Sequence, residues 1–363
     1  MAGSVALAAL AGAMAIAGPA AAAAPADTSI GQVYALGAAA PYGGAPVRDA
    51  TGLARTRSGR GYWVASGDGG VFAFGDAGFY GAATSGKSRH LVVDMASSPA
   101  ADGYWLVGSD GGVFAFGAAR FLGSVGSVPL NAPVVAMAAT PSGNGYWLVA
   151  RDGGVFAFGD AVFLGSVGGT RLNAPVVAMA ATPSGNGYWL VARDGGVFAF
   201  GDATFAGSAA DRSYTQRIVD VLGAPDGKGY WLAGTDGTVL NFGTAPAPVA
   251  AVPPGAPVAA AEATAGGDGV WLVTGGVLIG EFDVTCYALR GNTASGARVS
   301  EQVVAVDPRL IPLGTDVFVN GIGIRRALDT GGAVNGRRLD LWHPSAAWCR
   351  DFGVRRLATY RVP

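Results

Sequence analysis

Charge, cysteine and histidine are all scarce in this sequence. Only 13% of the 363 residues are charged and the formal net charge is −1, so the composition gives no reason to expect nucleic acid as a partner. The two histidines, His90 and His343, have no cluster of ligand-type residues around them. We therefore expect no metal site and no cofactor. Beyond the N-terminus, no stretch is long and apolar enough to cross a bilayer.

The one long apolar run lies at the N-terminus. Residues 1–26 are rich in Ala and end in Ala24-Pro25-Ala26, a small-x-small site for cleavage before Asp27. This pattern is typical of a secretory signal peptide, although no Lys or Arg precedes the run, and an uncleaved membrane anchor is the alternative. We expect residues 1–26 to be a signal peptide and the mature protein to be secreted, with no membrane attachment after cleavage.

The sequence has two cysteines, Cys286 and Cys349, and both lie in its last quarter. In an exported protein, a single disulfide between them is expected, and two buried free thiols are the alternative. The bond would close a loop of about 60 residues and stabilise the fold by roughly 3–4 kcal/mol in the chain-entropy model.

Glycine, in contrast, is abundant, and it recurs with a fixed period. The tripeptide Gly-Tyr-Trp begins at five positions that are each 42 residues apart: Gly61, Gly103, Gly145, Gly187 and Gly229. A degenerate copy, Gly-Val-Trp, begins 40 residues later at Gly269. Residues 131–161 are also identical to residues 173–203. A period of this length indicates a repeat protein.

Each repeat consists of short apolar runs separated by turn residues. In one unit the runs are 134–140, 146–150 and 155–158, followed by a shorter and less regular run at 163–167. Turn residues between β-branched and aromatic runs predict an antiparallel meander. About 42 residues and four short strands are the size of one propeller blade, in which the repeated aromatic side chains fill the space between neighbours.

The chain ends of the repeat region predict how the ring closes. Residues 32–43 are similar to the later half of a unit, and the last unit, from about residue 257, fades at 275–280. We therefore expect residues 30–277 to form a six-bladed β-propeller whose N-terminal strand completes the last blade. Seven blades are the alternative. The units resemble Gly-Tyr-Trp repeats of secreted actinobacterial proteins, which implies no defined activity and leaves the ligand or protein partner of the propeller open.

A second domain of mostly β structure is expected at residues 278–363, where the repeat ends and Arg becomes frequent. Its predicted helix is 344–351, with Ser345 as a possible N-cap residue. Its predicted strands are 282–288, 302–306, 316–319, 322–328, 338–342 and 356–361.

Three aspartates of this domain lie in or beside apolar runs, where an unpaired carboxylate is expensive to bury. Asp307 precedes Pro308 and Asp329 precedes Thr-Gly-Gly, so turn formation is an alternative role for both. Asp340 lies between two leucines in a strand pattern. If the leucines face the core, Asp340 faces a groove or solvent.

The segments TCYALRGNTASG, VVAVDPRLIPLGTDVFVNG and ALDTGGAVNGRRLDLWHP resemble the 3D domain, which is named for three aspartates. This domain is found in stationary-phase survival proteins, in resuscitation-promoting-factor-like wall proteins and in the lytic transglycosylase A family. The resemblance implies a small double-psi β-barrel that cleaves peptidoglycan glycan strands. It also implies an extracellular location in association with the cell wall.

The resemblance also assigns roles to single residues. It implies that Asp340 is the catalytic acid and that Asp329 and Asp307 support it. Tyr287 and Thr293 fall in the motif that borders the groove of the family. From the residues alone, the Arg337-Arg338 and Arg325-Arg326 pairs suit substrate carboxylates, with surface salt bridges as the alternative. His343 is expected to be a hydrogen-bonded neighbour rather than a base.

The chemistry of a lytic transglycosylase needs one protonated carboxyl group rather than two carboxylates. The C6 hydroxyl of the muramic acid is tethered to the sugar that it attacks, so a single aspartate protonates the glycosidic oxygen and then accepts the hydroxyl proton. Burial and a neighbouring carboxylate both raise the pKa of such a group. Two other hypotheses stay open: an expansin-like cell-wall-binding protein without catalysis, and an interaction scaffold built on the propeller.

Overall fold

The structure is a computed structural model that describes residues 31–44, 47, 49–83, 91–99, 102–210, 216–247 and 255–362. The expected signal peptide and His90 lie outside the described residues. In the part of the chain that is described, no helix is long and apolar enough to span a membrane.

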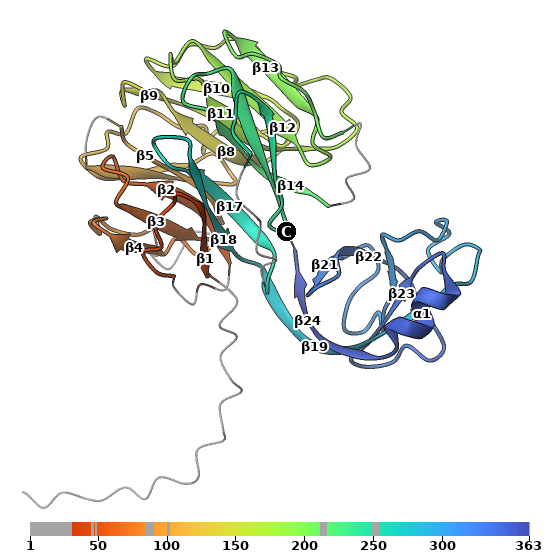
Figure 1. The fold of residues 1–363 in the computed structure, drawn as a ribbon. Helices are drawn as coiled ribbons and strands as arrows, with labels where there is room; N and C mark the ends of the chain where they lie inside the picture. Colours follow the sequence, from red (N-terminus) through yellow and green to blue (C-terminus); the bar gives the residue numbers. More distant parts are fainter. Residues whose placement is uncertain are drawn as a thin grey trace, which may run out of the picture.

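Six antiparallel sheets of three strands form a ring of blades (Figure 1). Their strands are β2 (Ala50–Arg55), β3 (Gly61–Ser66) and β4 (Val71–Gly75); β5 (Val92–Ser97), β6 (Gly103–Gly108) and β7 (Val113–Gly117); β8 (Val134–Ala139), β9 (Gly145–Ala150) and β10 (Val155–Gly159); β11 (Val176–Ala181), β12 (Gly187–Ala192) and β13 (Val197–Gly201); β14 (Ile218–Gly223), β15 (Gly229–Gly234) and β16 (Val239–Gly243); and β17 (Val258–Ala263), β18 (Gly269–Thr274) and β1 (Val33–Gly37).

The middle strand of every blade is buried along its whole length, because both of its faces pack against neighbouring blades. Its Tyr and Trp rings make the contacts between blades. Trp147 of one blade, for example, lies 5.6 Å from Tyr188 of the next, measured between ring centroids. The repeated aromatic residues are therefore packing residues, which confirms the role predicted from their period.

The N-terminal strand closes the ring. Strand β1 pairs with β18, so that Val33 lies opposite Val273 and Gly37 opposite Gly269. The first strands of the blades contact one another in the order β2, β5, β8, β11, β14 and β17, and β17 contacts β2 again. The predicted closure and the count of six blades are confirmed.

The prediction of a fourth strand in each blade is wrong. In the unit described above, residues 163–167 form no strand. Side chains form hydrogen bonds with backbone carbonyl groups in and directly before this segment. Trp147 Nε1 donates to Val162 O at 2.8 Å, and the Tyr188 hydroxyl donates to Gly165 O at 2.6 Å. Because these carbonyl groups bind side chains, and because Gly165 has a positive φ of 131°, the segment does not extend the ladder.

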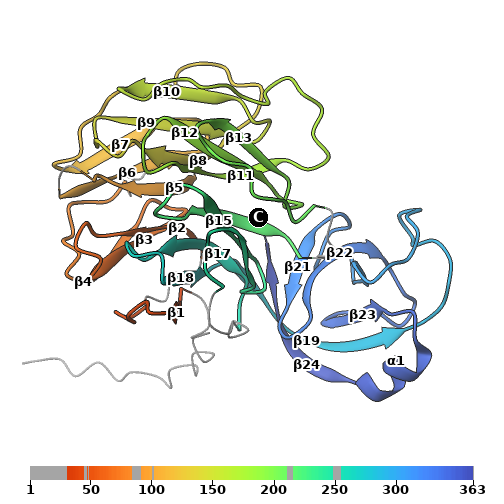
Figure 2. The ribbon, with the colours of Figure 1, turned by 45° about the horizontal axis from the view of Figure 1, so that its top comes forward.

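The C-terminal domain is a closed barrel with the strand order β19-β23-β20-β22-β21-β24 (Figure 2). Strands β19 and β23 are parallel, as are β20 and β22, and the other neighbours are antiparallel. The strands are β19 (Val277–Tyr287), β20 (Val303–Ala305), β21 (Asp316–Val319), β22 (Gly323–Asp329), β23 (Arg338–Trp342) and β24 (Arg355–Arg361). The molecule is therefore all-β apart from the short helix α1 (Ala346–Phe352), which Ser345 caps as predicted.

One difference from prediction lies in β19, which begins five residues before the predicted start at residue 282. A register shift between Leu278 and Gly280 lets the first residues of β19 pair with the end of β24, as in the pair Val277 and Arg361. These two strand ends connect the barrel to the propeller (Figure 1).

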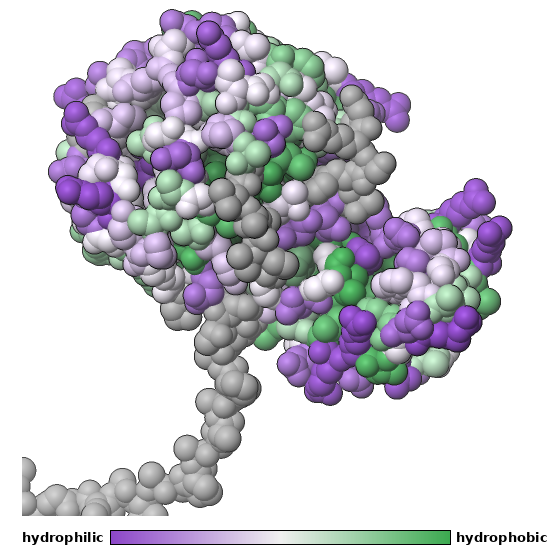
Figure 3. Space-filling model, viewed as in Figure 1, coloured by the Kyte–Doolittle hydropathy of each residue, from purple (hydrophilic) through white to green (hydrophobic). Residues whose placement is uncertain are grey.

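Polar contacts hold the propeller against the barrel. Arg217 of the propeller forms an ion pair with Asp316 of the barrel, and Gln216 Oε1 accepts a hydrogen bond from Ile324 N at 2.9 Å. Figure 3 shows hydrophilic residues in the region where the two parts meet. This contact could not be predicted from the sequence, because its partners are about 100 residues apart.

The hydrogen bonds of the buried tyrosines predict a measurable stability loss. The Tyr146 hydroxyl donates to Gly123 O at 2.6 Å and accepts from Leu122 N at 3.1 Å. Tyr146→Phe leaves both backbone groups without this partner, so it should lower the free energy of unfolding by about 1–3 kcal/mol in urea denaturation followed by tryptophan fluorescence. Tyr34→Phe is the control, because the Tyr34 hydroxyl bonds to no described residue, and equal losses in both variants would contradict this account.

Candidate functional site

Four residues form a row across four neighbouring strands of the barrel. Asp340 of β23 pairs with Thr285 of β19 on one side and with Ala305 of β20 on the other. Ala305 also pairs with Asp329 of β22. Side chains of residues that lie opposite one another point to the same face of a sheet. The row therefore places two carboxyl groups on one face, on either side of the small side chain of Ala305.

A β-bulge brings Asp329 into this row. Val304 pairs with Ala327, but the next residue, Ala305, pairs with Asp329, so Leu328 is the extra residue. Without the extra residue, Leu328 would lie opposite Ala305 and Asp329 would face the other way. Bulges that redirect a side chain are common beside active sites. No period in the sequence indicates this bulge.

The surroundings of Asp340 raise the pKa of its carboxyl group. The flanking Leu339 and Leu341 are buried in the barrel core, so the aspartate faces the opposite side, as the alternation predicts. Burial raises the pKa of Asp340, and the negative charge of Asp329 raises it further. A hydrogen bond from Thr285 Oγ1 to Oδ1 at 2.8 Å, and the charge of Arg338, lower the pKa and only partly offset this rise.

Asp329 is held by three donors. Its Oδ2 accepts from the Tyr287 hydroxyl at 2.8 Å, and its Oδ1 accepts from Ala294 N at 2.8 Å and from Thr330 N at 2.9 Å. Burial raises the pKa of Tyr287, and the bond to Asp329 adds to this rise, so the hydroxyl stays a proton donor. The group acts as a fixed negative charge next to Asp340.

Asp307 is not part of this row. Its carboxylate accepts from Arg309 Nε at 2.9 Å, from Arg309 Nη2 at 2.6 Å and from Gly336 N at 2.7 Å. These bonds, above all those from Arg309, hold the pKa of Asp307 well below its usual range. Asp307 also accepts from Arg309 N, which is the turn-forming alternative considered from the sequence.

The remaining predicted residues surround the row. Thr293 is buried, and its hydroxyl lies 2.9 Å from that of Ser295, in the loop that presents Ala294 N to Asp329. Arg338 is exposed, and its Nη1 donates to Ala333 O at 3.3 Å. Thr293 therefore shapes the loop, while Arg338 acts on Asp340 through its charge.

The C-terminal end of β23 and helix α1 brace this side of the barrel. Cys286 and Cys349 form a disulfide that ties β19 to α1. The ring of His343 stacks on that of Trp348 at 4.2 Å, and its Nδ1 accepts from Ser345 N at 3.1 Å. These contacts use His343 as a structural neighbour.

A hollow of about 470 Å³ lies at the end of β23 that follows Asp340, and the four residues of the row are not among its lining residues. Trp342, two residues after Asp340 and thus on the same face of β23, forms one wall and donates from Nε1 to Leu289 O at 2.7 Å. The other lining residues are Ala288, Arg290, Gly291, Asn292, Arg298, Val299 and Pro344. The sequence analysis did not single out these arginines. Their position within and after TCYALRGNTASG is the signal that would have found them.

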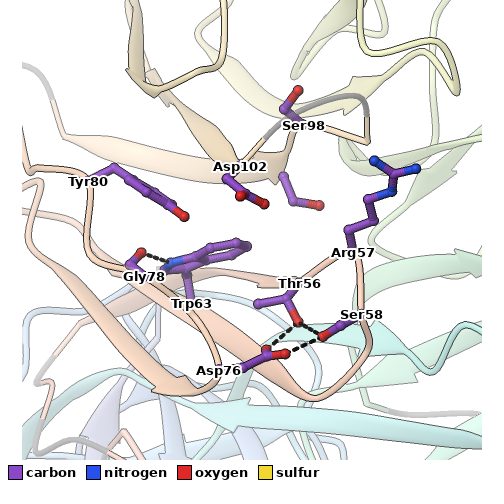
Figure 4. A pocket seen from close by; sticks show the side chains of 10 residues that line it. Thr56, Arg57, Ser58, Trp63, Asp76, Gly78, Tyr80, Ser98 and Asp102 are labelled. Carbon is purple, nitrogen blue, oxygen red and sulfur yellow. Dashed lines mark hydrogen bonds between the residues drawn. The ribbon is translucent and has the colours of Figure 1, made fainter.

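A second hollow, of about 90 Å³, lies between two blades of the propeller (Figure 4). Asp76 accepts from Thr56 at 2.9 Å and from Ser58 at 2.5 Å in its wall. The same trio recurs two blades later as Thr140, Ser142 and Asp160. Because the bonds recur, they belong to the repeat structure, in which they tie two loops of a blade together.

Comparison with known proteins identifies the barrel. Residues 302–361 match the family model of the 3D domain. Two proteins of Bacillus subtilis (strain 168) are similar: "Cell wall-binding protein YocH", 39% identical over 74 residues, and "Putative cell wall shaping protein YabE", 39% identical over 76 residues. These matches cover 19% and 20% of this chain, and the chain spans 26% of the length of the first relative and 19% of the second.

Among solved structures, the β-propeller domain of Cps50 (Swd1) from Myceliophteria thermophila is similar, with a TM-score of 0.41 and 12% sequence identity. The match covers 62% of this chain and 83% of that one.

The two carboxyl groups Asp307 and Asp340 predict opposite effects on stability. The folded state lowers the pKa of Asp307, so its contribution is present above the unfolded pKa of about 4 and is lost as the pH falls. The folded state raises the pKa of Asp340, so its contribution is present at low pH and is lost as the pH rises. At pH 7, Asp307→Asn should lower the melting temperature by several degrees, and Asp340→Asn should leave it unchanged or raise it.

Thermal unfolding of both variants between pH 3 and pH 8 is the measurement. The difference in melting temperature between Asp307→Asn and the parent protein should become smaller toward pH 3. Equal losses in the two variants at pH 7 would show that the described environments are not those in solution.

Proposed function

We propose that the protein is exported and acts on peptidoglycan as a lytic transglycosylase, with Asp340 as the acid and base. The observation that carries the proposal is the position of Asp340. The pKa of Asp340 is raised, the carboxylate of Asp329 lies across Ala305, and Trp342 on the same face of β23 lines a hollow of about 470 Å³. The match to the 3D domain and the names of the two relatives support peptidoglycan as the polymer.

The reaction uses one proton and one carboxyl group. Protonated Asp340 donates its proton to the glycosidic oxygen between MurNAc and GlcNAc as the bond from C1 to that oxygen breaks. The C6 hydroxyl oxygen of the same MurNAc then bonds to C1, and its proton passes to the Asp340 carboxylate. The product has a 1,6-anhydro end, the GlcNAc keeps a free hydroxyl, and Asp340 is protonated again.

The neighbouring residues assist this cycle without exchanging protons. Asp329, which Tyr287 and the loop after Asn292 hold in place, raises the pKa of Asp340 and places negative charge beside the positive charge that develops on the sugar. Arg290 and Arg298 line the hollow, where they suit the lactyl or peptide carboxylates of the substrate.

A second candidate function is wall binding without cleavage. The name of one relative describes a cell wall-binding protein. In addition, Asp307 is engaged by Arg309 and Gly336, so only two of the three aspartates lie together. A barrel of this kind would hold a glycan strand in the same hollow and release no product.

Product analysis distinguishes the two functions. Purified sacculi digested with the full chain should release muropeptides with 1,6-anhydro ends. Asp340→Asn should reduce the rate at least about 100-fold, because the acid contributes a factor of this order. Asp351→Asn, at an exposed position of α1, is the matched control and should keep full activity. Binding to sacculi with no released fragments would favour the binding function.

The pH dependence of the reaction tests the assigned environment of Asp340. Activity that needs the protonated form should fall as the pH rises through the pKa of Asp340. Arg338 lowers this pKa, so Arg338→Gln should move the falling limb to higher pH, and Asp329→Asn should move it to lower pH. The measurement is the initial rate of release between pH 4 and pH 9. A limb that neither substitution moves would exclude Asp340 as the titrating acid.

A further inference from the structure

A cavity of about 390 Å³ lies at the end of the propeller channel that adjoins the barrel. The first strands of all six blades contribute to its wall, and Gly276 and Arg361 contribute from the two strand ends that lead into the barrel. Most of the wall is apolar and includes Val93, Val135 and Val177. A volume of this size is within the range of about 300–1,000 Å³ that is typical of small-molecule sites.

Two arginines of this cavity break the symmetry of the repeat. Arg151 and Arg193 occupy the same position in two successive units, directly before the Asp-Gly-Gly turn. In the other units this position holds an uncharged residue: Gly67, Ser109, Thr235 and Gly275. Packing of the blades therefore does not require arginine there, since four blades form without it.

No residue that the structure describes pairs with the guanidinium groups of Arg151 and Arg193. Within the described residues, neither side chain makes a hydrogen bond or an ion pair, although Arg193 is partly buried. Burial and the charges of Arg217 and Arg151 lower the pKa of Arg193 to about 10, which shows that these cations oppose one another. An unpaired cation in a partly buried position destabilises the fold unless an anion binds to it.

A third arginine adds to the positive side of the cavity. Arg217 pairs with Asp316 through Nη2, but its buried Nη1 has no hydrogen-bond partner. Four arginines are among the described lining residues: these three, and Arg361 at the end of β24. Of the first three, only Arg217 is engaged by a carboxylate, that of Asp316. Guanidinium groups bind carboxylates with two parallel hydrogen bonds, so this side of the cavity suits a carboxylate ligand.

The other side of the cavity carries one negative charge. Asp49, directly before β2 of the first blade, lines the same cavity. In a ring of six, the first blade lies opposite the fourth, which carries Arg193. Apolar side chains of the blades lie between the two charged sides. The blades thus place three cations on one side of the cavity, one carboxylate on the opposite blade and apolar side chains between them, while Arg361 lines the cavity from the barrel.

We propose that this cavity binds a short peptide through its free ends. The C-terminal carboxylate is held by Arg151, Arg193 and Arg217, the amino group lies toward Asp49, and small apolar side chains contact the valine wall. The site is distinct from the row of Asp340 and Asp329 and does not depend on the reaction proposed for the barrel.

Calorimetry on the full chain with tri-alanine as the probe tests this assignment. Tri-alanine should bind, and its C-terminal amide should bind at least about tenfold more weakly because it lacks the carboxylate. Its N-acetyl derivative should also bind more weakly, because it has no amino group for Asp49. Arg151→Gln and Arg193→Gln should each weaken tri-alanine at least about tenfold, whereas Arg171→Gln, at an exposed position outside the cavity, should have no effect.

A melting curve of each variant separates binding from folding. Arg193→Gln removes an unpaired, partly buried charge. In the absence of tri-alanine, this variant should therefore melt at the same temperature as the parent protein or at a higher one. Arg151 is exposed, and Arg151→Gln gives a second variant whose folding is not at risk. The proposal is overturned if tri-alanine does not bind at millimolar concentration, if the amide binds equally well, or if inorganic phosphate binds and tri-alanine does not.

Discussion

The pairing of Ala305 with Asp340 on one side and Asp329 on the other is the constraint on which the chemistry of the barrel depends. Two carboxyl groups on either side of one small residue affect one another electrostatically. Because both lie on the same face of the sheet, one substrate can contact both of them. The parallel pairing of β20 with β22 and the extra residue Leu328 are needed to bring this about. The closed barrel thus holds the two groups by backbone hydrogen bonds rather than by flexible loops.

The environments of the two groups differ in a way that suits different tasks. Asp329 accepts three hydrogen bonds and is fixed, whereas Asp340 accepts one from Thr285 and has the raised pKa. A carboxyl group with a raised pKa beside a hydrogen-bonded carboxylate is a common arrangement for an acid and its electrostatic partner. The third aspartate, Asp307, lies outside the row, and its carboxylate accepts hydrogen bonds from the backbone and side chain of Arg309.

Periodic features of this chain could be predicted from its sequence, and contacts between distant residues could not. The 42-residue period and the similarity of residues 32–43 to half a unit predicted the six blades and the closing strand β1. The fourth strand was mispredicted because Trp147 and Tyr188 bind the backbone that a ladder would use. In the barrel, the alternation around Asp340 predicted its direction, but the bulge at Leu328 leaves no trace in a hydrophobic pattern.

The propeller and the barrel meet through Arg217 and Asp316, and the cavity of the channel lies at this junction. Peptidoglycan contains short peptides as well as glycan strands, so the two proposals name ligands from one polymer, although each stands without the other. The repeat provides a rigid ring, and the two exceptions to its symmetry, Arg151 and Arg193, provide the chemistry of the cavity. Function in this chain is therefore expected where the repeat is broken and where the barrel departs from regular pairing.

The central claim is that the folded barrel keeps Asp340 protonated above the ordinary range of an aspartate. The most direct test is a titration of the aspartate side-chain carboxyl carbons by NMR, with the Asp340 resonance assigned by its loss in Asp340→Asn. The account predicts a midpoint above the usual value of about 4, and a lower midpoint when Asp329 is replaced by Asn. A midpoint at or below the usual value, or one that does not change in Asp329→Asn, would contradict the account.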